Sequence, residues 1–149
     1  MVKLGGHAMG SMLALMLAGA LPIVAVAGDT HRIRSDEIER LLDAIAKVES
    51  RHDLNATGDG GKAVGVYQIH RDYWADGTKF LGVTWDYALA ADPEKAREVV
   101  RAYLLHYGQG CTLLEMARIH NGGPNGYKKP STLAYARKIA RILKDTGPA

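Results

Sequence analysis

Glu49 is an acidic residue at a position where the helical pattern of the sequence predicts an apolar one. Apolar side chains recur at three- and four-residue spacing from Ile38 to Val48, which is typical of one buried stripe along an α-helix. Glu49 continues this stripe at the carboxyl end of the predicted helix, where the helix dipole is negative. Burial and the dipole both disfavour a charged carboxyl group, so we expect a raised pKa for Glu49. Such a group could hold a proton near neutral pH and donate it as a general acid.

A second carboxylate follows in a glycine-rich segment. Residues 57–69, TGDGGKAVGVYQI, predict a turn and a short β-hairpin that carries Asp59. Cleavage of a glycosidic bond needs one carboxyl group to protonate the leaving oxygen and a second one to attack or stabilise the cationic sugar. We therefore predict Glu49 as the acid and Asp59 as the nucleophile or stabiliser, with Asp53 and Asp72 in reserve. Asp-Gly is also common in tight turns, so a purely structural role for Asp59 stays open.

Capping signals and apolar periodicity predict the elements that must position these residues. The predicted elements are, in order, a helix from Ser35 as N-cap to about Ser50, a loop and hairpin over 51–69, a short helix or turn over 71–75, an irregular stretch that includes Trp85, a helix from the Asp92-Pro93 cap to Gly108, a helix from the Thr112/Glu115 capping box to about His120, and a last helix over about 131–144. The predicted fold class is α+β, mostly α, with several helices and one small antiparallel hairpin.

Four short motifs resemble, in the same order, those of one known family. They are Val48-Glu49-Ser50, Gly65-Val66-Tyr67-Gln68-Ile69, Tyr73-Trp74-Ala75-Asp76 and Ala117-Arg118-Ile119-His120-Asn121-Gly122-Gly123-Pro124. Together they resemble the invertebrate-type lysozymes, the destabilase family, and more widely the lysozyme-like superfamily that includes lytic transglycosylases. That family is rich in disulfides, whereas this chain has one cysteine, Cys111. The sequence therefore resembles a cysteine-poor relative whose fold depends on packing alone.

The resemblance implies a lysozyme-like domain and a muramidase, a glycoside hydrolase that cleaves the β-1,4 bonds of peptidoglycan. It implies Glu49 and Asp59 as catalytic residues. It also indicates substrate contacts at Ser50, Tyr67, Gln68, Tyr73, Trp74, His120 and Asn121. Tyr67 could equally belong to the core, and Asn121 could equally form a turn. Two other functions stay open: a lytic transglycosylase that uses Glu49 alone, and a wall-binding module without catalysis.

Composition and the amino terminus set the remaining expectations. The formal net charge is +3 and the chain has no basic run or RNA-binding motif, so we do not expect nucleic acid as a partner. The resemblance implies that the partner is the glycan strands of peptidoglycan. No metal-ligand spacing or nucleotide motif is present, so we expect no metal and no cofactor. Residues 1–27 have the pattern of a signal peptide, which predicts one domain over 28–149 that is exported to the periplasm or secreted. We expect a monomer with no stable membrane insertion after cleavage of the signal.

Overall fold

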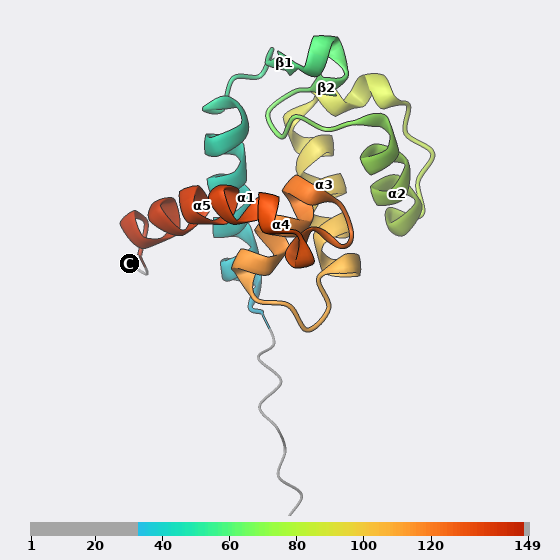
Figure 1. Cartoon of the computed structure of the whole chain (residues 1–149). Helices are drawn as coiled ribbons and strands as arrows, with labels where there is room; N and C mark the ends of the chain where they lie inside the picture. The colour runs from blue at the N-terminus through green and yellow to red at the C-terminus, as the bar shows by residue number, and fades with distance from the viewer. Residues whose placement is uncertain (1–32, 148–149) are drawn as a thin grey trace, which may run out of the picture.

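The computed structural model describes residues 33–147, and the predicted signal peptide lies outside this range. In the described range, five α-helices surround a buried core and one small hairpin lies at one end (Figure 1). The elements in chain order are α1 (Ser35–Ser50), β1 (Thr57–Gly58), the 3₁₀ turn η1 (Asp59–Gly61), β2 (Ala63–Val64), α2 (Arg71–Leu81), η2 (Tyr87–Ala91), α3 (Pro93–Tyr107), α4 (Leu113–Gly122), η3 (Gly126–Lys128), η4 (Pro130–Thr132) and α5 (Leu133–Asp145). The predicted fold class, mostly α with one antiparallel hairpin, is confirmed.

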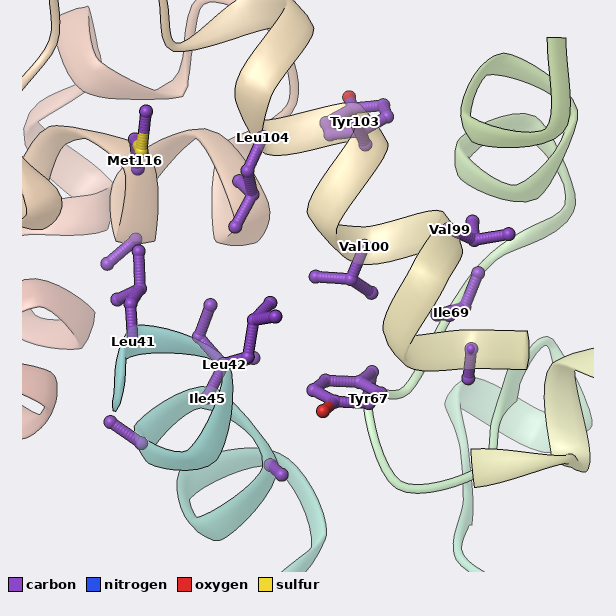
Figure 2. Packing of buried hydrophobic residues seen from close by; sticks show 14 of the residues in the cluster. Leu41, Leu42, Ile45, Tyr67, Ile69, Val99, Val100, Tyr103, Leu104 and Met116 are labelled. Atoms are coloured by element: carbon purple, nitrogen blue, oxygen red, sulfur yellow. The ribbon is translucent and has the colours of Figure 1, made fainter. Parts of the chain in front are cut away.

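The core forms where α1, α3 and α4 meet. Leu41, Leu42 and Ile45 project from α1 toward Val100 and Leu104 of α3, as Figure 2 shows, and all five side chains are fully buried. These α1 residues belong to the apolar stripe that the sequence predicts. Burial of a leucine or isoleucine contributes about 1.5–3 kcal/mol, so this stripe fixes the position of α1 and of the glutamate at its end.

Two of the helices have the caps that the sequence predicts. The Asp92 side chain accepts hydrogen bonds from the backbone N–H groups of Glu94 and Lys95 at the start of α3. At the start of α4, the Glu115 carboxylate accepts a hydrogen bond from the Thr112 backbone N–H, and the Thr112 hydroxyl accepts one from the Glu115 N–H. Each such cap contributes about 1 kcal/mol and fixes where its helix begins.

The predicted N-cap of α1 is off by one residue. Ser35 is the first helical residue, and Arg34 is the N-cap. The Arg34 backbone N–H donates to the Glu37 carboxylate over 2.9 Å, so an acidic side chain of the first turn provides a hydrogen-bond acceptor for a backbone N–H at the start of the helix.

The helix after the hairpin is longer than predicted. We expected only a short helix or turn over 71–75 because Gly77 would interrupt it, but α2 continues to Leu81. Gly77 is buried against α3, where an added Cβ would lie 2.5 Å from a methyl carbon of Val99. The glycine is therefore a point of close helix packing and not a break in the helix.

The hairpin is also shorter than predicted. β1 and β2 pair antiparallel over two residues each, with Thr57 opposite Val64 and Gly58 opposite Ala63. Residues 65–68 form a turn, in which the Gln68 N–H donates to the Gly65 carbonyl over 3.0 Å. Tyr67 and Gln68 are therefore turn residues and not strand residues of the hairpin predicted over 57–69.

Candidate active site

A polar cavity of about 260 Å³ lies between the hairpin and the ends of three helices. Its lining residues are Glu49, Asp59, Ala63, Gln68, His70, Tyr73, His120 and Asn121. Six of these eight are residues that the sequence predicts as site residues. The cavity thus gathers side chains from the end of α1, the hairpin, the start of α2 and the end of α4.

Glu49 lies in the last turn of α1 with its side chain 19% exposed. Its Oε1 is 3.6 Å from Nε2 of His120, whose side chain is only 5% exposed. Burial raises the pKa of Glu49, but His120, the Tyr135 hydroxyl and the charge of Lys138 together bring that pKa below its usual value. The predicted raised pKa is therefore wrong for the free protein. The prediction counted burial but could not count partners from α4 and α5.

His120 connects Glu49 to a stack of aromatic rings. Its Nδ1 is 3.1 Å from the Tyr73 hydroxyl, so the two groups share a hydrogen bond. The Tyr73 ring stacks on Tyr103 with 3.6 Å between the ring centroids, and burial raises the pKa of the Tyr73 hydroxyl well above its usual value. The tyrosine therefore remains a neutral donor or acceptor, and it fixes the orientation of the imidazole that faces Glu49.

Asp59 has very different surroundings from Glu49. Its side chain is 68% exposed, and its Oδ2 is 2.8 Å from Nε2 of His70. The backbone of Asp59 has a φ of 49°, in the left-handed region that Asp and Asn tolerate better than most residues. The turn and the histidine together hold this carboxylate at the cavity.

Gln68 closes the cavity on the hairpin side. Its side-chain amide donates to the Gly65 carbonyl over 2.9 Å, and a Cβ on Gly58 would collide with its amide oxygen. Gly58 thus leaves room for the glutamine side chain to lie against the hairpin. Asn121 lies in the last turn of α4, exposed and next to His120 in the same cavity lining.

Three predicted substrate contacts do not lie at this cavity. The single proton of the Ser50 hydroxyl is shared between the carbonyls of Val66, at 2.9 Å, and Ala46, at 3.2 Å, which ties the end of α1 to the hairpin segment. Tyr67 is buried and its hydroxyl accepts a hydrogen bond from Arg97, while the buried Trp74 donates to the Trp85 carbonyl. These side chains contact the protein itself, so we propose no sugar contact for them.

The reserve carboxylates lie elsewhere, and one site residue was missed. Asp53 accepts a hydrogen bond from the Asn55 N–H, and Asp72 lines a neighbouring cavity. His70, which pairs with Asp59, was not predicted from the sequence. The only signal for it is its place directly after the Gly65–Ile69 motif, and pairing with Asp59 needs the folded hairpin.

Within residues 33–147, no group of three or more His, Cys, Asp or Glu side chains is arranged to hold a metal ion. In the same range, no helix is both long and apolar enough to cross a membrane.

A family model and individual relatives of known function indicate the same family for this chain. The family model described as Destabilase matches residues 39–142. A lysozyme of Ostrea edulis is 47% identical over 75 residues, which are 48% of this chain and 53% of that protein. A lysozyme of Magallana gigas is 41% identical over 83 residues, 50% of this chain and 56% of that protein. The chain thus spans about half the length of these two curated relatives.

A third relative and a solved structure are matched over most of their length. A lysozyme of Meretrix lusoria is 36% identical over 110 residues, which are 70% of this chain and 88% of that protein. A chain from the crystal structure of Aeromonas hydrophila PliI in complex with Meretrix lusoria lysozyme superposes with a TM-score of 0.60. It is 35% identical, and the match covers 70% of this chain and 89% of that one.

Proposed function

Because this chain belongs to the Destabilase family, we propose that it is a muramidase, an enzyme that hydrolyses the β-1,4 bonds between N-acetylmuramic acid and N-acetylglucosamine in peptidoglycan. One observation carries the proposal. A partly buried carboxyl group, Glu49, and an exposed one, Asp59, line the same polar cavity. Two carboxyl groups in unlike surroundings can divide the acid and the stabilising roles that glycoside hydrolysis needs.

In the proposed reaction, Glu49 donates its proton to the leaving glycosidic oxygen. Asp59 attacks or stabilises the positively charged sugar carbon that forms as this bond breaks, and His70 holds Asp59 in place. Water then supplies a hydroxyl group to the sugar carbon and returns a proton to Glu49. Gln68 and Asn121 are suitable hydrogen-bonding partners for the sugar hydroxyl and acetamido groups.

The lowered pKa of Glu49 means that its carboxyl group is ionised in the free protein at neutral pH. The acid form is populated as the pH falls, so we expect activity to increase toward acidic pH. A bound glycan also excludes water from the exposed part of Glu49, and this strengthens the effect of burial, which favours the protonated form.

We further propose that the mature protein acts outside the cytoplasm as a monomer. Export is supported by the signal-like segment over 1–27 and by the location of peptidoglycan, which lies outside the membrane. Detection of the processed chain in the periplasm or the medium would test the first part, and its mass in solution would test the second.

The central test is the variant Glu49→Gln, which keeps the shape of the side chain and removes its proton. Loss of a general acid typically reduces the rate by about 10²–10⁴-fold, and we expect this loss on purified peptidoglycan. Glu98→Gln, on α3, makes the same chemical change in a residue that does not line the cavity, and it should retain activity. Unchanged turnover by Glu49→Gln would reject the assignment.

One observation favours a second candidate function. Asp59 is 68% exposed, so Glu49 is the only partly buried carboxyl group in the described lining of the cavity. A lytic transglycosylase needs only one such acid, because a hydroxyl group of the sugar itself attacks. Mass spectrometry of the products separates the two, since anhydro ends indicate a transglycosylase and reducing ends a hydrolase. Binding with no fragments released would indicate a wall-binding module.

A further inference from the structure

A second cavity, of about 400 Å³, adjoins the one that holds Glu49 and Asp59, because His70 lines both. Its other lining residues are Gly61, Lys62, Arg71, Asp72 and Tyr87. The hydrolysis proposed above uses neither cation of this set. We call this space the cationic cavity because a lysine and an arginine, Lys62 and Arg71, line it together with one acidic side chain, Asp72.

The two cations are not neutralised by the protein. Within the described part of the chain, neither Lys62 nor Arg71 forms an ion pair. Arg71 is also the first residue of α2, where the helix dipole disfavours a positive charge, whereas Asp72 in the same turn is favoured there. The position of Arg71 therefore does not serve the stability of its own helix, and its charge remains available to a ligand.

Tyr87 contacts the guanidinium of Arg71 and the backbone of Lys62. The guanidinium carbon of Arg71 lies 4.4 Å from the centroid of the Tyr87 ring, a cation–π contact. The hydroxyl oxygen of the same tyrosine lies 2.7 Å from the Ile69 carbonyl oxygen and 2.9 Å from that of Lys62, so its single proton is shared between these two acceptors. One aromatic side chain thus orders the arginine and fixes the backbone that carries the lysine. This lowers the entropic cost of ordering these residues when a ligand binds.

We propose that the cationic cavity binds the carboxylates of the peptide stem attached to muramic acid, while the sugars occupy the adjoining cavity. This inference rests on the proposed function. In peptidoglycan, every second sugar carries a short peptide with free carboxylates, so an anionic group emerges beside the glycan strand at regular intervals. Lys62 and Arg71 match these carboxylates in charge, and the Asp72 carboxylate can accept a hydrogen bond from a peptide N–H.

The test measures binding in the Glu49→Gln protein, so that the ligand is not consumed. Three soluble ligands are compared by calorimetry: a disaccharide with its peptide stem, the same molecule with its carboxylates amidated, and the disaccharide without peptide. Each exposed ion pair is worth a few tenths to about 1 kcal/mol, so two pairs should make the charged ligand bind about fivefold more tightly than the other two.

Substitutions assign this preference to the cavity. Lys62→Gln combined with Arg71→Gln should abolish the preference, whereas Arg71→Lys should retain most of it. Lys79→Gln, at the exposed opposite end of α2, removes the same charge away from the cavity and should leave the preference intact.

Equal affinity for all three ligands would overturn the inference, as would an unchanged preference in the double variant. The proposed function is judged separately, by turnover of peptide-free glycan strands by the unsubstituted protein. Absence of that turnover together with stem-dependent binding would reject hydrolysis and leave the cationic cavity as a binding site.

Discussion

Removal of His120 should move the pH dependence of catalysis to higher pH. The general acid must be protonated, so kcat/KM falls as the pH rises past the pKa of Glu49. Burial raises that pKa, and a charged His120 beside Glu49 lowers it. His120→Gln removes the positive charge, so the protonated form of Glu49 is favoured. The alkaline limb of the profile, where kcat/KM falls with rising pH, should therefore move to higher pH.

The size of this shift follows from the distance of 3.6 Å between His120 Nε2 and Glu49 Oε1. Two unit charges at this distance attract by about 1 kcal/mol at the dielectric constant of water and by about 5 kcal/mol at an effective value of 20. The lower figure alone corresponds to about a fivefold change in the ratio of protonated to ionised Glu49. Both side chains are mostly buried, so we expect the fall in activity to occur at a proton concentration at least about fivefold lower in the variant.

Initial rates of peptidoglycan solubilisation, measured from acidic to neutral pH, give the profile. NMR titration of the Glu49 carboxyl group in both proteins provides a readout that does not depend on catalysis. His106→Gln, an exposed histidine in the last turn of α3, makes the same chemical change away from the cavity and should leave the profile unchanged. A limb that stays in place or moves to lower pH in His120→Gln would refute the role assigned to His120.

Three further outcomes follow from the packing around the site. His70→Ala should reduce kcat by about tenfold because Asp59 loses its partner at 2.8 Å, whereas His70→Asn, which can still donate a hydrogen bond, should lose less; equal losses in steady-state assays would contradict this. Gly77→Ala should lower the free energy of unfolding by about 1–3 kcal/mol in urea denaturation, because the new methyl group meets Val99, and an unchanged midpoint would contradict the packing described. Arg97→Gln should lower the free energy of unfolding by about 1–2 kcal/mol in the same measurement, because Arg97 joins α1 to α3 through ion pairs. These ion pairs are partly exposed, so high salt should reduce the difference in stability between the variant and the unsubstituted protein.

Much of the helical framework could be predicted from the sequence because its signals are local. The cap formed by Asp92 and Pro93 and the capping box of Thr112 and Glu115 act on residues within one turn. They give the start of α3 and α4 without knowledge of the fold. The extent of α2 could not be predicted in this way. Gly77 is compatible with a helix because its lack of a side chain lets α3 pack closely, and that contact forms only in the folded protein.

The same distinction holds within the candidate site. The 3.6-residue period placed Glu49 at the end of the apolar stripe of α1, and the glycine-rich turn placed Asp59 in the hairpin. Whether a predicted aromatic residue lines the cavity depends on the direction of its side chain. Tyr73 faces the cavity, whereas the next residue, Trp74, points into the core. Successive helical positions point about 100° apart.

The sequence by itself determined which residues form helices and that an acidic group ends the apolar stripe of α1, because propensity, capping and periodicity act over a few residues. Only the tertiary structure decided the charge state of that group, because His120 from α4 and Tyr135 from α5 reach it across the fold. It also decided the pairing of Asp59 with His70, since the hairpin must close before the two side chains meet. Electrostatic interactions depend on the distance between charges in space, and separation along the chain does not predict that distance.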